Sequence, residues 1–417
     1  MIQDSMKKNI VDTKVIVVGG GLVGCVFAEA LSSAGIDNVV IDTQNLRNNN
    51  KLPSDGRASA LALASKRVFE NIGLWSRLEK FATPILDIRV SDHDSFQYLH
   101  FNHQEVGDDP LGFMLENSYI RNAQAWFLEE NNHTTFFAPN KVKELVRSDK
   151  DTTAHLTDGT VIRAPLIVAA DGRNSQMRKM FGIHLTKHSY NQSAIVCTIE
   201  HQRSHNFIAH ERFLPHGPFA ILPLLGSAKK PNKRSSIVWT ERPDLVSVFV
   251  ALPKEEFLFE LQRRAGDFLG NLKLVSPRWD YPLTMQFTNT CIGYRFALIG
   301  DSAHGMHPIA GQGLNMGIRD AATLAEIVVD GLRSGNDIGS WENLKNYQTR
   351  RRFDNFLMLA ATDGINRLFS NNFLPIKVVR DFGLATVNKF PGIKKAFIRY
   401  AMGEMPSAPR LMRGVRL

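Results

Sequence analysis

The most constraining feature of the sequence is a glycine-rich turn near its N-terminus. Residues 14–18 (KVIVV) predict a short buried strand, and residues 22–34 predict a helix of small and apolar side chains. Between them stand Gly19, Gly21 and Gly24, in the pattern G-x-G-x-x-G. In a strand–turn–helix unit, such glycines allow a tight turn, the close approach of a pyrophosphate, and packing of helix on strand. The alternative is an incidental glycine turn without a ligand.

A second predicted strand, residues 39–41, ends at Asp42, which favours nucleotide binding. An acid at this position accepts a hydrogen bond from a ribose hydroxyl. The pattern leaves open which dinucleotide binds, because dehydrogenases and flavoproteins share it. Arg57 follows in the run DGRASALA at residues 55–62. It would approach a phosphate or ribityl group, or remain a solvated surface residue.

Residues 296–332 form a second candidate cofactor segment. The apolar run at residues 296–299 predicts a strand that ends at Gly300 and Asp301, and a polar loop leads to GQG at residues 311–313 and a long helical pattern. Glycines let the backbone approach a ligand closely, and a helix N-terminus attracts an anion. We therefore expect a cofactor site here, with an ordinary strand-to-helix turn as the alternative.

Two weaker signals lie between these segments. Residues 119–130 predict a helix with Arg121 and Gln124 on one face, and a strand at residues 166–170 ends at Asp171. An acid and a glycine at a strand end can hold sugar hydroxyls and phosphates. An Asp-Gly turn with a capping serine explains the same residues without a ligand.

The pattern changes from about residue 190 to residue 285, where short apolar runs alternate with turn-rich segments. These runs are residues 193–200, 207–214, 219–225, 237–240 and 245–252. Regularly spaced short runs predict an antiparallel sheet, inserted here between parts of a nucleotide-binding domain. Residues 85–105 predict its first strands. One face of this sheet could cover a substrate pocket.

The length of 417 residues allows two domains, or one large domain with an insertion. No apolar run approaches the roughly 18 residues needed to span a bilayer, and residues 1–14 lack the apolar core of a signal peptide. The three cysteines are far apart and give neither a zinc spacing nor a disulfide framework. We therefore expect a reducing, cytosolic setting.

Most of the net charge of +9 lies in the C-terminal region. Residues 371–417 contain nine basic and two acidic residues. Helical patterns at residues 321–334 and 341–368 lead into this region, where residues 373–402 mix apolar and basic side chains. A basic amphipathic stretch fits an anionic membrane surface or a partner. A helix packed on its own protein, with solvated lysines and arginines, is the alternative.

Three nucleotide-type segments indicate a long, extended dinucleotide such as FAD. Their order resembles that of the flavin-dependent aromatic hydroxylases with the fold of p-hydroxybenzoate hydroxylase, over residues 13–365. The run HPIAGQGLNMGIRD at residues 307–320 is similar to the signature of the UbiH-type ubiquinone-biosynthesis hydroxylases. DGRASAL at residues 55–61 and GDSAH at residues 300–304 also fit that family. The Trp-x-Trp-x-Ile-Pro motif of flavin halogenases is absent from the sequence.

The resemblance implies an α/β fold with a Rossmann-like FAD-binding domain, an inserted antiparallel-sheet substrate domain and a basic helical C-terminal region. The expected boundaries are 1–80, 106–185 and 286–365 for the FAD-binding domain, 81–105 and 186–285 for the substrate domain, and 366–417 for the C-terminal region. The residues expected to contact FAD are Gly19, Gly21, Gly24, Asp42, Arg57, Arg121, Gln124, Asp171, Asp301, Gly311, Gln312, Gly313, Leu314 and Asn315. The first four would hold the ADP half, Asp301 the ribityl chain or nearby phosphate, and the last five would face the isoalloxazine ring. Pro308 is expected at the reaction face of the flavin.

The implied reaction is hydroxylation of the aromatic ring of a polyprenylated phenol in ubiquinone biosynthesis. NADPH, or another electron donor, would reduce FAD, and the reduced flavin would trap O₂ as a C4a-hydroperoxide that the ring attacks. His304 and His307 would act as acid–base groups or shape their loop.

The resemblance also implies partners: other ubiquinone-biosynthesis proteins and a membrane surface bound by the basic C-terminal region, but not nucleic acid. The expected location is the cytoplasm, or the periphery of a bacterial inner membrane. Two alternatives remain, a flavin hydroxylase of a soluble non-quinone phenol and a binding protein that uses FAD only structurally.

Overall fold

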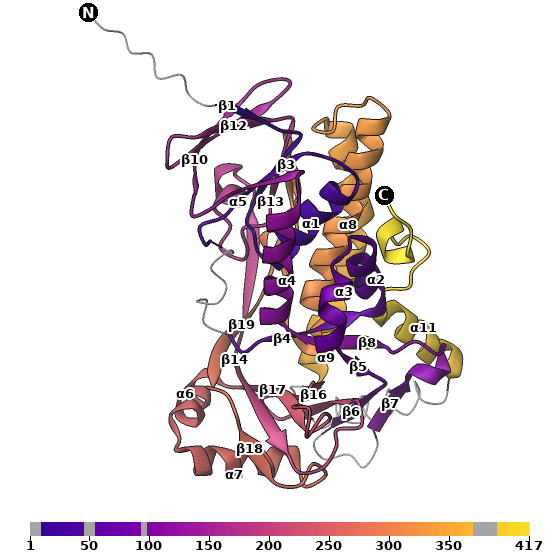
Figure 1. The fold of residues 1–417 in the computed structure, drawn as a ribbon. Helices are drawn as coiled ribbons and strands as arrows, with labels where there is room; N and C mark the ends of the chain where they lie inside the picture. Colours follow the sequence, from indigo (N-terminus) through magenta and orange to yellow (C-terminus); the bar gives the residue numbers. More distant parts are fainter. Residues whose placement is uncertain (1–9, 46–54, 93–97, 370–389) are drawn as a thin grey trace, which may run out of the picture.

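The computed structural model describes residues 10–45, 55–92, 98–369 and 390–417 (Figure 1). Its centre is a six-stranded sheet of order β20-β21-β13-β2-β3-β9, in which all neighbours are parallel except β20 and β21. The strands are β2 (Val15–Val18), β3 (Asn38–Ile41), β9 (Thr134–Phe137), β13 (Leu166–Ala169), β20 (Ile292–Gly293) and β21 (Phe296–Leu298). The strands predicted at residues 14–18, 39–41, 166–170 and 296–299 are therefore confirmed.

Both faces of this central sheet are buried, which explains the continuous apolar runs of its strands. On one face, Val15 and Val17 pack against α1 (Leu22–Ser33) and α8 (Gln312–Arg333). On the other face, Ile16 and Val18 pack against a four-stranded sheet of order β1-β12-β11-β10. That sheet consists of β1 (Ile10–Asp12), β10 (Val142–Arg147), β11 (Thr152–Leu156) and β12 (Val161–Ala164).

A nine-stranded sheet forms the lower half of the molecule in Figure 1. Its order is β22-β19-β14-β17-β16-β15-β6-β7, with β18 attached to β14. The strands are β6 (Asp87–Asp92), β7 (Tyr98–Asn102), β14 (Leu185–His201), β15 (Ile208–Leu214), β16 (Gly217–Leu224), β17 (Arg234–Glu241), β18 (Leu272–Leu274), β19 (Trp279–Thr288) and β22 (His304–Gly305). Residues 85–105 do supply two of its strands, as predicted.

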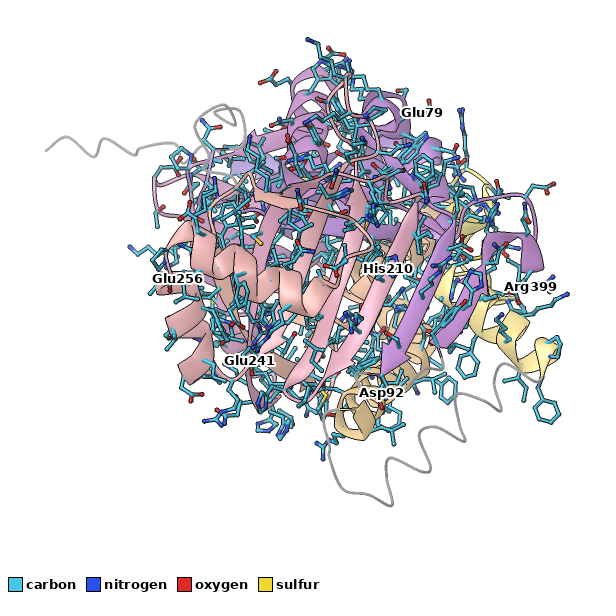
Figure 2. The ribbon with its side chains drawn as sticks, turned by 90° about the horizontal axis from the view of Figure 1, so that it is seen from below. Glu79, Asp92, His210, Glu241, Glu256 and Arg399 are labelled. Atoms are coloured by element: carbon cyan, nitrogen blue, oxygen red, sulfur yellow. The ribbon has the colours of Figure 1, made fainter. Side chains whose placement is uncertain are left out.

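The two faces of the nine-stranded sheet have different neighbours. Helices α6 (Pro243–Ala251) and α7 (Lys254–Ala265) cover the outer face, which Figure 2 views from below. The inner face lies against a three-stranded sheet of order β4-β8-β5. Its strands are β4 (Ala58–Ala62), β5 (Thr83–Ile85) and β8 (Gly112–Glu116).

Two details of the expected substrate-domain sheet were wrong. Residues 245–251 lie in α6 rather than in a strand, and Leu252 is its C-cap; Pro243 and Asp244 in the first turn favour a helix start. The sheet is also not wholly antiparallel, since β6 pairs with β15 in parallel. Residues 119–130 are confirmed as a helix, α4 (Asn117–Glu130).

Two helices and a buried turn form the described C-terminal part. These are α9 (Trp341–Phe369), α11 (Pro391–Ala401) and the 3₁₀ helix η6 (Arg410–Arg413). Leu411 and Met412 are buried in the main core. The helix expected at residues 373–402 is present from Pro391 onward, and its earlier part lies outside the described residues. Among those described, no helix combines the length and apolarity needed to cross a membrane.

Candidate functional site

Three glycine-containing segments meet at the carboxyl ends of the central parallel strands. A Cβ atom added at Gly19 would lie 2.4 Å from the carbonyl oxygen of Ala170, so the first turn touches the end of β13. A Cβ atom at Gly317 would lie 2.5 Å from Val23 Cγ2 and 3.4 Å from Gly300 Cα. The start of α1 and the second turn of α8 therefore meet at the loop after β21. In open α/β sheets, this edge is where ligands bind.

The N-terminus of α1 is open toward this edge. Gly21 is the N-cap and no side chain caps the helix. A Cβ atom at Gly21 would meet nothing within 4 Å, whereas one at Gly24 would lie 1.9 Å from the Gly19 carbonyl oxygen. Gly24 thus permits internal packing, and Gly21 leaves room beside free backbone N–H groups. Such a helix start suits a phosphate.

Two acids stand at strand ends beside this turn. Asp42 Oδ2 accepts a hydrogen bond from Gly20 N at 2.5 Å, and Oδ1 accepts one from Gln44 N at 2.7 Å. Asp171 Oδ2 accepts one from Met177 N at 3.0 Å. Its Oδ1 is buried without a hydrogen-bond partner among the described residues. Asp42 therefore orders the glycine turn, and Asp171 keeps one acceptor available.

Two arginines connect the Asp171 segment with the loop after β21. Arg173 Nε lies 3.2 Å from Asp301 Oδ2, and Arg173 also donates to the Met306 carbonyl. Arg178 is buried and donates to the Ser302 carbonyl at 2.8 Å. Burial lowers the pKa of Arg178. Sequence reasoning did not identify this connecting role, because it depends on loops more than 120 residues apart.

The N-terminus of α8 is a second open helix start. Gly311 is its N-cap with φ of 62°, and no side chain caps it. A Cβ atom at Gly313 would meet nothing within 4 Å. Asn315 is buried, and its amide donates to Ala60 O at 2.8 Å and accepts from Ala62 N at 2.9 Å. Asn315 therefore fixes α8 to β4 beside the open turn.

Arg57, Arg121 and Gln124 hold neighbouring elements in place. Both arginines bind the carboxylate of Asp55, and together they lower its pKa although burial opposes the shift. Gln124 Nε2 donates to Leu22 O at 2.9 Å, at the start of α1. Gln124 thus reaches the turn itself. Contact of these three side chains with FAD stays a prediction.

His304 is held by a buried ionic network. Its Nε2 lies 2.6 Å from Asp320 Oδ2, which also accepts from Gly300 N at 3.0 Å. Asp320 Oδ1 accepts from Arg351 Nε at 2.7 Å. Burial opposes ionisation of Asp320, yet His304 and Arg351 hold its pKa far below the ordinary range. His304 therefore shapes the loop, and Asp320, which the sequence analysis did not single out, organises it.

His307 differs from His304 because its Nε2 is buried without a partner among the described residues. Burial lowers its pKa to about 4, so the ring is neutral. It meets Tyr190 edge-on, with ring centroids 5.0 Å apart. Pro308, the next residue, is exposed at the N-cap of the short turn before α8, whereas Gln312 and Leu314 are half-buried. The turn thus presents Pro308 outward.

A groove of about 500 Å³ lies beside Tyr190. Its walls come from β14, the turn between β15 and β16, Arg242 and the end of α9. Because Tyr190 lines this groove and also contacts His307, the groove ends one side chain away from the segment before Pro308.

These features fit FAD. Two helix starts are open, and the loops after β2, β13 and β21 meet at one edge of the sheet, where several loops can enclose a long ligand. The unpaired Asp171 oxygen and the space beside Gly21 and Gly313 leave acceptors and room for sugar and phosphate. The fold and the site define an FAD-binding monooxygenase of the aromatic-hydroxylase type.

The comparisons with known proteins agree. A family model described as an FAD binding domain matches residues 12–354. The chain is 47% identical over 406 residues to the ubiquinone hydroxylase UbiL of Rhodospirillum rubrum, with 97% of this chain and 93% of that protein covered. It is 30% identical over 395 residues to the 3-demethoxyubiquinol 3-hydroxylase of Escherichia coli, covering 94% and 98%. The chain belongs to the family of FAD-dependent ubiquinone hydroxylases.

A solved structure supports the fold. The p-nitrophenol 4-monooxygenase PnpA of Pseudomonas putida has a TM-score of 0.77 with this chain, at 18% sequence identity, covering 95% of this chain and 99% of that one.

Proposed function

We propose that this FAD-dependent monooxygenase hydroxylates the aromatic ring of a polyprenylated phenol in ubiquinone biosynthesis. The observation that carries the proposal is the 47% identity to a ubiquinone hydroxylase over 97% of the chain. The open helix starts and glycine turns supply a cofactor site that suits this reaction. A soluble non-quinone phenol is the competing substrate.

Different residues of the chain would bind different parts of the cofactor. The start of α1 would bind the pyrophosphate, and Asp42 a ribose hydroxyl. The start of α8 would direct N–H groups and positive potential at the electron-rich end of the flavin ring. Bound FAD would supply the redox chemistry between NADPH, or another electron donor, and O₂. Pro308 and the Gly311–Asn315 turn would position the ring and exclude water.

The test is genetic. Deleting the gene should lower the quinone pool and accumulate a prenylated phenol that lacks one ring hydroxyl, identified by mass spectrometry. Wild-type protein supplied in trans should restore the pool, and a variant unable to hold FAD should not. An unchanged quinone pool would rule out this function. The accumulated compound would also identify the ring carbon that is hydroxylated.

We also infer that the C-terminal helices dock on an anionic membrane surface, where a prenylated substrate resides. Ile393 and Phe397 on α11 are exposed beside Lys395 and Arg399. Tyr400 donates to Asp354 of α9 at 3.0 Å, so the two helices are neighbours. The exposed face of α9 is apolar as well, with Phe353, Phe356, Leu357 and Ile365. Apolar side chains beside cations fit the interface of an anionic bilayer.

Vesicle flotation tests this docking. The wild-type protein should float with vesicles containing anionic lipid, and the double variant Ile393→Ser/Phe397→Ser should not. Trp341→Ser is the matched control, because Trp341 is an equally exposed apolar residue at the opposite end of α9. Equal flotation of all three proteins would contradict membrane docking through α11. Association with other ubiquinone-biosynthesis proteins is a further proposal, which co-purification would test.

A further inference from the structure

Glu211 is an ionisable residue on the inner face of the nine-stranded sheet. It lies in β15 between His210 and Arg212, and successive strand residues point to opposite faces. His210 contacts Phe268 on the outer face, with ring centroids 4.5 Å apart, and Figure 2 shows it there over the middle of the sheet. Burial lowers the pKa of His210, and Arg89, its partner in β6, and Arg212 share that face and add to the shift. Glu211 therefore points inward.

The neighbours of Glu211 place it opposite the turn before α8. Phe213, two residues along β15, packs in one cluster with Ile309, which directly follows Pro308. Ala209, two residues back, packs in a cluster that includes Ala60 of β4. Ala60 in turn lies against Gly311, where an added Cβ atom would be 3.1 Å from its Cβ. The two side chains that flank Glu211 thus reach both sides of the Pro308–Gly311 turn.

The strand neighbours of Glu211 on the inner face are apolar and of small or moderate size. Ala220 is its partner in β16, and Val90 is its partner in β6. Glu211 is only half-buried, although it sits in an interior strand beneath another layer of the protein. Its side chain therefore keeps some accessible surface on the inner face of the sheet.

No described residue forms a hydrogen bond or ion pair with Glu211. Among the described residues, the charged groups on the elements around it are Asp92, further along β6, and the ion pair of Arg234 in β17 with Glu116 in β8. The Asp363–Arg367 ion pair lies at the end of α9, whose Leu368 packs with Phe213 and Val90. Burial alone raises the pKa of Glu211 to about 7. A carboxyl group on an inner sheet face, without a partner among the described residues, is costly, so its position opposite the Pro308–Gly311 turn points to a function.

We propose that Glu211 is a catalytic residue that binds the ring hydroxyl of the phenol substrate and accepts its proton. The phenolic O–H bond breaks, the electron pair stays on the phenolate oxygen, and the proton moves to a carboxylate oxygen of Glu211. The negative charge makes the ring a better nucleophile toward the oxygen that it receives. This assignment rests on the proposed function, since it needs a phenol as the substrate.

The experiment compares holoenzymes with Glu211→Gln, Glu211→Asp and the control Glu241→Gln. Glu241 is a buried glutamate of the same sheet, and its register with Ser193 places it on the outer face with Trp239. With 2-geranylphenol as the substrate, Glu211→Gln should lower kcat about 100-fold or more, which is typical for loss of a general base. KM should change little, and Glu211→Asp should recover part of kcat.

A further readout separates a catalytic role from a structural one. The wild-type kcat and that of Glu241→Gln should rise with pH through about 7, and Glu211→Gln should lose that rise.

The outcomes distinguish this proposal from the function on which it rests. If the wild type hydroxylates 2-geranylphenol and Glu211→Gln keeps the same kcat and pH profile, Glu211 has no catalytic role. If the wild type neither binds nor hydroxylates the prenylated phenol, the proposed function fails and the role of Glu211 in it fails too.

Discussion

The side-chain amide of Asn315 donates a hydrogen bond to the carbonyl oxygen of Ala60, 255 positions earlier in the chain. The same amide accepts one from Ala62 N. The Asn315 side chain thus supplies hydrogen-bond partners for two backbone groups of β4, and it holds the first turn of α8 against that strand. We expected Asn315 to contact the flavin, and the structure gives it this structural task as well.

Replacing Asn315 with alanine should weaken both the fold and FAD retention. The variant leaves two backbone groups of β4 without a partner, and each such buried group costs about 1–3 kcal/mol. We expect a lower free energy of unfolding in urea and a lower ratio of FAD to protein after purification. Asn343→Ala, which removes an exposed bond to the Asp337 carbonyl on the surface, is the control. An unchanged free energy of unfolding of Asn315→Ala would contradict this structural role of Asn315.

Gly21→Ala and Gly24→Ala should separate cofactor binding from folding. The added methyl at Gly21 enters open space, so the apoprotein should unfold at an unchanged temperature while FAD affinity falls. The methyl at Gly24 would collide with the Gly19 carbonyl, so that variant should also lose stability. Calorimetry of the apoproteins and FAD titration measure the two effects. If both variants lost FAD affinity and thermal stability to the same extent, the two glycines would not have these separate roles.

Asp301→Ala should lose FAD affinity and keep its fold. The carboxylate is half exposed and its ion pair with Arg173 adds little to stability. Asp12→Ala removes a similar exposed pair with Arg163, far from the glycine turns, and should retain FAD. Flavin absorbance per protein gives the result. An Asp301→Ala protein that purifies with full flavin would show that Asp301 does not bind the cofactor.

Asp320→Asn should destabilise the protein severely at neutral pH. The fully buried carboxylate of Asp320 is paired with His304 and Arg351. Its removal leaves uncompensated buried charge, at a cost of about 3–5 kcal/mol. Because its folded pKa is depressed, the stabilisation is present above the unfolded pKa of about 3.9 and is lost as pH falls below that value. Urea unfolding measured across this pH range should show the loss of stability in the wild type and a smaller loss in the variant.

Glu211→Gln should have the opposite effect on stability. The folded pKa of about 7 lies above the unfolded value, so the folded protein is penalised progressively as pH rises from about 4.3 to 7. The variant removes that penalty, a gain on the order of 3–4 kcal/mol at pH 8 and almost none at pH 4. Urea unfolding at both pH values tests this difference. An equal change at both would mean that Glu211 is not buried as a carboxyl group.

Local patterns predicted the cofactor half of the molecule better than the substrate half. The strand, glycines and helix around residues 14–34 are adjacent in sequence, so each signal supports the next. The eight-residue apolar run at 245–252 fits a strand or a helix equally, and only the proline and aspartate before it favour α6. The apolar run of a strand also does not indicate which strand it pairs with, so the parallel pairing of β6 and β15 could not be predicted.

Two residues, Glu211 and Asp320, could not be identified from the sequence for a related reason. Glu211 is notable only because the register of β15 with β6 and β16 turns it inward, and no local pattern encodes that register. Asp320 stands inside the run that resembles the family signature, yet its role depends on Arg351, one helix later. Burial and long-range pairing create both roles.

The contact of Val23 with Gly300 and Gly317 also fixes when the cofactor can enter. A ribosome releases the glycine turn of residues 19–24 early, but the opposite wall exists only after the chain has passed residue 317. Until then the first turn lacks the surfaces that would enclose a ligand. FAD loading is therefore a late event in the life of the nascent chain, and cells short of flavin should accumulate the full-length protein without cofactor.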